Sequence, residues 1–191
     1  MSLNIAVLQN LPAMTVRFYR DSDFDHAYRV IREIGPTYLG RNLRGWDKVF
    51  IELAGLMWVV SINDVPVAFA GLAPPSETSL PFFHTDLVSP AYQRRGLGTL
   101  LTLTQLAALM NDPVEHVGVL ATEHSAPFYQ RFGFELEDAP QLDPFAGYHI
   151  HRLSMPYAAH IGQAADELLD TLTQVSFDLS VEEDPFEDEA H

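Results

Sequence analysis

A glycine-containing loop between an apolar strand and a leucine-rich helix constrains the fold of this chain more than any other feature. The loop is Gln93-Arg94-Arg95-Gly96-Leu97-Gly98, and an apolar run over residues 80–88 leads into it. After the loop, apolar residues recur at helical spacing between Leu100 and Met110, which predicts a helix over residues 100–110. Glycine allows the backbone to approach a ligand closely, and the first turn of a helix offers unpaired N–H groups to an anion. The segment therefore predicts a strand, a loop and a helix that together bind a phosphate or pyrophosphate.

Three kinds of phosphate-binding loop can be compared with this segment. A dinucleotide-binding loop would need a third small residue three places after Gly98, where Leu101 stands. A Walker loop would need a Gly-Lys pair before Ser or Thr, and the single lysine of the chain is Lys48. The third pattern, Gln/Arg-x-x-Gly-x-Gly/Ala, is matched at every position by residues 93–98. It is the pyrophosphate loop of the GCN5-related N-acetyltransferase (GNAT) superfamily, which this segment resembles.

Two further segments resemble the same family and stand in the same order. Val16-Arg17-Phe18, followed by an aspartate-rich cap, is similar to the first strand of the family. Residues 126–134, in which Tyr129 precedes Gly133-Phe134, are similar to its penultimate helix. The resemblance covers residues 15–156. It implies an α/β fold (an α+β mixed sheet), with a GNAT-like central mixed β-sheet flanked by helices on both faces.

The hydrophobic pattern predicts elements in the order β-α-α-β-β-β-α-β-α-β-β. The predicted strands cover residues 15–20, 57–62, 65–72, 80–88, 114–122, 134–137 and 148–155, and the predicted helices cover residues 21–34, 41–55, 100–110 and 126–132. Asn63-Asp64 predicts a tight hairpin turn, and Gly35-Pro36 predicts the end of the first helix. We expect three parts: a leader over residues 1–14, a GNAT acetyltransferase domain over residues 15–156, and a C-terminal extension over residues 157–191.

Composition narrows the range of functions. The chain has 191 residues, 47% of them hydrophobic, and no cysteine, which excludes disulfides and a thiolate nucleophile. Its net charge of −15 argues against a nucleic-acid partner. The longest unbroken apolar run, residues 53–60, is too short to cross a bilayer, and no secretory signal is recognisable. We therefore expect a soluble, cytoplasmic protein without a membrane partner.

The resemblance implies transfer of an acetyl group to an amine, with acetyl-CoA as the co-substrate and without a metal. It assigns the backbone of Leu87 and Val88 to the pantetheine and to polarisation of the acyl carbonyl. The residues that it assigns to the pyrophosphate are Gln93, Arg94, Arg95, Gly96, Leu97, Gly98 and Thr99.

The resemblance also assigns a general acid, whereas the general base stays open. Tyr129 matches the acid of the family, which protonates the leaving thiolate. His84 lies near the position where several family members carry a glutamate, and histidine titrates near neutrality. Asp86 shares the strand face of His84 under simple alternation, although a bulge would change that facing. Water is another candidate base, and Glu123 and His124 at the end of the next strand could also face the acceptor.

Several alternatives concern the ligands. The acceptor is an amine-bearing small molecule or peptide: a metabolite, a polyamine, an antibiotic amine or a protein N-terminus. A non-catalytic acyl-CoA-binding or sensor module of the same fold is the rival function, because the family's glutamate is missing. A longer acyl chain is also compatible with the loop. His149 and His151 have the i, i+2 spacing of metal ligands, but no third ligand is evident near them, so we expect no metal.

The C-terminal extension lies outside the resemblance. Apolar residues from Ile161 to Val175 recur at helical spacing opposite acidic residues, so this helix is expected to pack on the domain or on a second subunit in a homodimer. Phe177 and Leu179 alternate with polar neighbours, as in an edge strand. The acidic residues 181–191 predict either a solvated tail or an acidic lip that attracts cationic amines.

Overall fold

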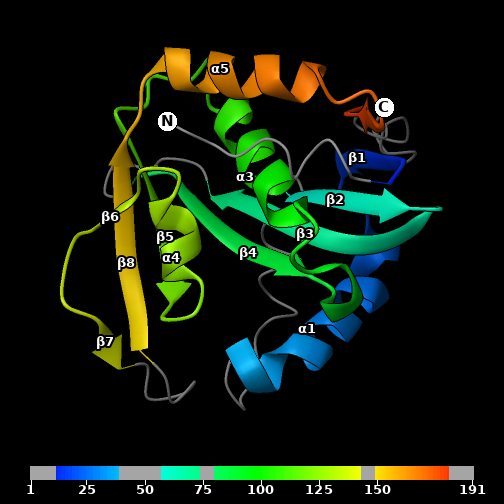
Figure 1. Cartoon of the computed structure of the whole chain (residues 1–191), viewed down its shortest axis with the longest axis horizontal. Coiled ribbons are helices and arrows are strands. Elements are labelled where there is room, and N and C mark those ends of the chain that lie inside the picture. The colour runs from blue at the N-terminus through cyan, green and yellow to red at the C-terminus, as the bar shows by residue number, and fades with distance from the viewer. Residues whose placement is uncertain (1–11, 39–56, 74–79, 143–148, 181–191) are drawn as a thin grey trace, which may run out of the picture.

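The computed structural model describes residues 12–38, 57–73, 80–142 and 149–180, which form one mixed β-sheet with helices on both faces (Figure 1). The strands are β1 (Met14–Phe18), β2 (Met57–Ile62), β3 (Val65–Ala73), β4 (Phe82–Val88), β5 (His116–Thr122), β6 (Glu135–Leu136), β7 (Gln141–Leu142), β8 (His149–Pro156) and β9 (Val175–Asp178). The helices are α1 (Phe24–Tyr38), α3 (Leu97–Ala108), α4 (Ala126–Gln130) and α5 (Ala159–Asp170), with short 3-10 turns at Asp21–Asp23 and Pro90–Tyr92. The predicted fold class is confirmed.

The strand order explains why the glycine loop lies at an edge of the central strands. The sheet runs β6-β8-β5-β4-β3-β2-β1-β9, and β7 pairs with β8 off this path. Among these pairs, β4–β5 and β1–β9 are parallel. A parallel pair needs a crossover connection, and α3 provides it between β4 and β5. The loop at residues 93–98 therefore follows the carboxyl end of β4, where the chain leaves the sheet.

Side chains of the buried strand β2 alternate between the two faces of the sheet, and each face has its own hydrophobic cluster. Trp58 and Val60 pack in a cluster with α3 and α5, whereas Met57 and Val59 pack in a second cluster with α1. The predicted hairpin joins β2 to β3 through Asn63 and Asp64, which have φ angles of 51° and 62°. Two consecutive residues with positive φ match the right-handed twist of the strands, which is why this dipeptide closes a hairpin.

The C-terminal extension packs on the domain. Helix α5 crosses α3 (Figure 1), and a Cβ atom at Gly162 would lie 2.6 Å from Cβ of Met110 and 3.0 Å from the carbonyl oxygen of Leu106. The Tyr157 hydroxyl donates a hydrogen bond of 2.8 Å to that same carbonyl. The edge strand predicted from Phe177 and Leu179 is β9, which pairs with β1 in parallel and ends at Asp178. A homodimer stays a prediction.

Several predicted boundaries are wrong. Helix α1 continues through Gly35 and Pro36 to Tyr38, because proline has a helical φ and removes only one hydrogen bond from the last turn. Helix α3 ends at Ala108, before Met110, and α5 ends at Asp170, so Val175 lies in β9. Strand β7 interrupts the loop predicted between the last two strands.

Some predictions fall outside the described residues: residues 1–11 of the leader, the helix over residues 41–55 and the tail over residues 181–191. No helix in the described part of the chain is long and apolar enough to span a membrane.

Candidate functional site

Strands β4 and β5 separate after a short stretch of pairing. Their register covers only Phe82 with Gly118 and Phe83 with Val119. The ring of Phe82 lies over Gly118, where a Cβ atom would come within 2.6 Å of it. Beyond Phe83, β4 has no register partner on β5 among the described residues. The strands therefore leave an opening, along which main-chain N–H and C=O groups of β4 can meet a ligand.

A bulge in β4 determines which side chains face this opening. Phe69 pairs with Leu87 and Gly71 pairs with His84, so three steps along β4 oppose two steps along β3. The extra residue is accommodated at Thr85, whose φ of 57° is an outlier for a β-branched side chain. His84 and Leu87 consequently share one face of the sheet, and Asp86 faces the other. Simple alternation would have placed Asp86 and His84 on one strand face, and the bulge changes that facing.

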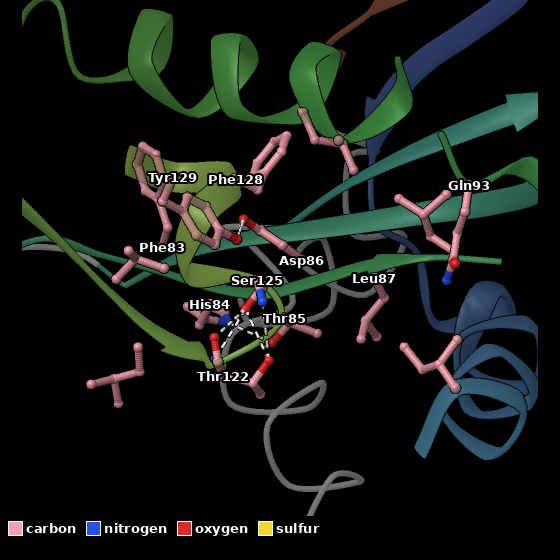
Figure 2. A pocket seen from close by; sticks show the side chains of 16 residues that line it. Phe83, His84, Thr85, Asp86, Leu87, Gln93, Thr122, Ser125, Phe128 and Tyr129 are labelled. Atoms are coloured by element: carbon pink, nitrogen blue, oxygen red, sulfur yellow. Dashed lines mark hydrogen bonds between the residues drawn. The ribbon is translucent and has the colours of Figure 1, made fainter. Parts of the chain in front are cut away.

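A cavity of about 370 Å³ lies where β4 and β5 separate (Figure 2). Its wall includes several residues predicted as site residues, namely His84, Asp86, Leu87, Val88, Gln93, Gly98 and Tyr129. Apolar and hydroxyl side chains from α3, β5 and α4 complete the wall, among them Leu101, Leu120, Thr122, Ser125 and Phe128. The volume lies in the range of small-molecule sites.

Asp86 and Tyr129 form the polar centre of the cavity. The Tyr129 hydroxyl donates a hydrogen bond of 2.5 Å to Oδ2 of Asp86, and Figure 2 shows the two side chains pointing toward one another. Nε2 of Gln105 donates a second hydrogen bond, 2.9 Å long, to Oδ1 of Asp86. Each carboxylate oxygen of Asp86 therefore accepts one hydrogen bond.

The surroundings raise the pKa of both Asp86 and Tyr129. Burial raises the pKa of Asp86 to about 7, although the hydrogen bonds from Tyr129 and Gln105 act against that rise. Burial, together with the nearby Asp86 carboxylate, raises the pKa of Tyr129 well above its usual value of 10. Tyr129 therefore keeps its proton at neutral pH, while Asp86 titrates in the physiological range.

His84 lies on the other face of β4, beside Thr85. Its Nδ1 is 2.6 Å from the Thr85 hydroxyl, and its ring occupies the space above Gly71 that a Cβ atom there would fill. Burial lowers the pKa of His84 to about 4, so its imidazole is neutral at pH 7. Its Nε2 is buried and has no hydrogen-bond partner among the described residues. The low pKa makes His84 a weak base, which argues against the role that its sequence position suggested.

The glycine loop lies at the start of α3, where the first helical turn has unpaired N–H groups. Gly96 precedes the helix with a φ of 97°, and Arg94 also has a positive φ, of 57°. Arg94 and Arg95 are exposed, whereas Leu97 is buried in the core and can offer a ligand only its backbone. The Gln93 side chain donates a hydrogen bond of 3.0 Å to the carbonyl of Val88, which ties the loop to the end of β4.

The remaining candidates lie away from this centre. Glu123 and His124 are exposed in the turn after β5 and do not line the cavity. His149 and His151 lie on β8, and no group of three His, Cys, Asp or Glu residues in the described part of the chain could hold a metal ion.

Reasoning from the sequence missed Gln105 and Thr85. Gln105 is fully buried, and its Nε2 also donates a hydrogen bond of 2.8 Å to the carbonyl of Gly71. A lone amide in a leucine-rich helix was a usable signal, since a buried polar group needs partners. Nothing in the sequence indicated the positive φ of Thr85.

Comparison with known proteins agrees with this geometry. A family model described as an acetyltransferase (GNAT) domain matches residues 54–136. No curated protein matches the chain in sequence. Among solved structures, the ribosomal-protein-S18-alanine N-acetyltransferase from Escherichia coli is 17% identical, with a TM-score of 0.60 over 76% of this chain and 94% of that one. Ard1 from Thermoplasma volcanium is 16% identical, with a TM-score of 0.64 over 75% and 97%.

A larger relative has been solved with its ligands. N-acetylglutamate synthase from Neisseria gonorrhoeae, complexed with coenzyme A and N-acetyl-glutamate, is 16% identical, with a TM-score of 0.60 over 75% of this chain. This chain covers only 35% of that protein. At these identities the structural similarity shows the fold. The chain therefore has the fold of these acetyltransferases, and the match to the GNAT family model covers residues 54–136, which include the loop that resembles the family.

Proposed function

We propose that this protein is an N-acetyltransferase, which transfers an acetyl group from acetyl-CoA directly to an amine. The observation that carries the proposal is that the Asp86–Tyr129 pair lies in the cavity formed where β4 separates from β5. The glycine loop adjoins this cavity through Gln93 and Gly98. An anion site, an open strand edge and a protonated hydroxyl group are therefore contiguous.

The residues present fit acetyl-CoA. The first turn of α3 leaves unpaired N–H groups, and Arg94 and Arg95 are exposed beside them, which suits a pyrophosphate. Gly98 has little room for a side chain, because a Cβ atom there would lie 3.3 Å from the Phe128 ring. We assign Gln93, Arg94, Arg95, Gly96, Leu97, Gly98 and Thr99 to the pyrophosphate, and the backbone of Leu87 and Val88 to the pantetheine arm and the acyl carbonyl.

Acetyl-CoA would supply a thioester, so that an N–C bond forms as the C–S bond breaks. The acceptor nitrogen loses one proton and the sulfur gains one, so the reaction needs a base for the nitrogen and an acid for the sulfur. Tyr129 is the proposed acid, because its raised pKa keeps a proton available at the cavity wall. At rest the Tyr129 hydroxyl donates a hydrogen bond to Asp86. As the C–S bond breaks, the hydroxyl gives its proton to the sulfur, and water returns a proton to the tyrosinate. We assign removal of the acceptor proton to water, since the pKa of His84 is too low for an efficient base.

The acceptor is an amine-bearing small molecule or peptide. The cavity wall carries no lysine or arginine among the described residues, and Asp86 is its single carboxylate. The proposed catalytic unit spans residues 15–156, and helix α5 of the C-terminal extension packs on α3. We expect the protein to act in the cytoplasm, without nucleic-acid or membrane partners.

A non-catalytic acyl-CoA-binding module is the second candidate. Two observations favour it. Both carboxylate oxygens of Asp86 already accept hydrogen bonds, and the pKa of His84 is low, so neither residue is an evident free base.

Calorimetric titration with acetyl-CoA, followed by detection of thiol release across a panel of amines, separates the two candidates. Binding with release on at least one amine is expected. Binding without release across the panel would support the non-catalytic module, and absence of binding would contradict both.

A further inference from the structure

Gln105 is an unusual residue for its position on α3. It lies on a helix whose neighbouring side chains Leu101, Leu103 and Leu106 are buried in the core, and it is itself completely buried. Burying an amide in such a place costs free energy unless its groups are hydrogen-bonded. Its Oε1 has no hydrogen-bond partner among the described residues, so the acceptor of this amide is left unsatisfied. Its Nε2, however, has two partners.

One of those two partners lies on β3 and the other on β4. Nε2 donates to the carbonyl of Gly71 at 2.8 Å and to Oδ1 of Asp86 at 2.9 Å. Gly71 lies opposite His84 in the register of β3 and β4, just where the bulge displaces Asp86. Gln105 therefore bridges the two strands at the bulge and fixes one oxygen of the carboxylate. The other oxygen is left to accept the Tyr129 hydroxyl.

We propose that Gln105 is a positioning residue, which holds the Asp86 carboxylate in the orientation that fixes the Tyr129 hydroxyl in the cavity. Asp86 then serves to orient Tyr129, and it is not the base that accepts the proton of the acceptor. Only the expected effect on kcat rests on the proposed function. The arrangement Gln105–Asp86–Tyr129 is observed directly, through two hydrogen bonds to Asp86.

The groups that face Asp86 allow a direct test. Tyr129 from α4 and Gln105 from α3 donate to it, and His84 is the one other titratable residue in the described cavity wall. The hydrogen bond from Gln105 favours the ionised carboxylate. Removing that donor must therefore raise the pKa of Asp86 further, whereas loss of an unrelated buried hydrogen bond on α3 must not.

The test uses Gln105→Met, which keeps the length of the side chain without its donor. The matched control is Thr104→Val, because the Thr104 hydroxyl donates at 3.0 Å only to the carbonyl of Leu100 within the same helix. Carboxyl-carbon NMR of the whole chain, with the Asp86 signal assigned by Asp86→Asn, follows the titration. We expect Gln105→Met to raise the pKa of Asp86 by about one unit and the control to leave it unchanged, in keeping with the worth of a hydrogen bond to a charged group.

A double-mutant cycle tests the kinetic consequence. Gln105→Met is expected to lower kcat about tenfold with KM for acetyl-CoA nearly unchanged, and to have no further effect in a Tyr129→Phe background. An equal loss of kcat in both backgrounds would overturn the positioning role.

The spectroscopic arm stays decisive if the protein transfers no acetyl group. An unshifted Asp86 titration in Gln105→Met refutes the present inference, while absence of thiol release in the wild type refutes the proposed function instead. If Gln105→Met does not fold, Gln105→Glu replaces the donor by an acceptor of equal length. An Asp86 pKa that does not rise in Gln105→Glu overturns the inference as well.

Discussion

Replacing Asp86 by asparagine should remove a pH dependence of stability that the wild-type cavity creates. The carboxyl has a pKa of about 7 in the folded chain and an ordinary value of 3.8. Because the folded pKa is the higher one, the folded state binds more protons than the unfolded state between these values. Stability is therefore greatest below pH 4 with respect to this group, and is lost as the pH rises toward 7.

The magnitude follows from the size of the shift. About three units correspond to about 4 kcal/mol, since one unit is worth about 1.4 kcal/mol. Asp86 is partly exposed to the cavity, whose water screens part of this cost, so we expect about 2 to 4 kcal/mol. His84 contributes the opposite slope, because its pKa is lowered from 6.5 to about 4, but it is present in both proteins and cancels.

Urea unfolding of wild type and Asp86→Asn at several values from pH 4 to pH 8 measures this difference. The free energy of unfolding of the variant relative to wild type should rise by about 2 to 4 kcal/mol across that range. A difference that stays constant with pH would show that Asp86 has an ordinary pKa, and the assigned electrostatics of the cavity would then be wrong.

Three further predictions concern the ligand loop and the extension. Arg94→Ala should weaken acetyl-CoA binding about three- to tenfold at low salt, with the difference shrinking at high salt because the side chain is exposed; calorimetry that shows no salt dependence would contradict this. Gly98→Val should weaken acetyl-CoA binding at least about tenfold, since its side chain meets Phe128 and blocks backbone approach, and unchanged affinity would remove the loop from the ligand site. Gly162→Leu should lower the free energy of unfolding by about 3 kcal/mol in urea, because its side chain would overlap with α3. The control Ala164→Leu, at an exposed position of the same helix, should change the free energy of unfolding by less than about 0.5 kcal/mol. Equal effects of the two variants would refute the packing of α5 on α3.

The elements that the sequence predicted correctly depend on residues close to one another in the chain. The hairpin at Asn63-Asp64 follows from two residues that tolerate positive φ, and the strand–loop–helix unit follows from a change in hydrophobic period across Gly96. The end of α1 was misplaced because a glycine and a proline near a helix end are weak stop signals, since Pro36 removes only one hydrogen bond from the last turn.

The site required contacts that sequence spacing cannot supply. Asp86 and Tyr129 lie 43 residues apart, and Gln105 lies 19 residues from Asp86. Their meeting depends on the bulge at Thr85, which turns Asp86 away from the face of His84. The resemblance of residues 126–134 to the family's penultimate helix pointed to Tyr129 as a candidate acid, but its partner Asp86 followed only from this three-dimensional arrangement.

Steady-state thiol release by Tyr129→Phe, compared with its acetyl-CoA affinity, tests the central claim most directly. If the Tyr129 hydroxyl supplies the proton to the leaving sulfur, kcat should fall about 100-fold, because a positioned acid contributes roughly that factor. Calorimetry should show an acetyl-CoA affinity within about twofold of wild type, since the loop and the β4 backbone are untouched. A variant with unchanged kcat would contradict the assignment of Tyr129 as the acid, and with it the proposed chemistry of the cavity.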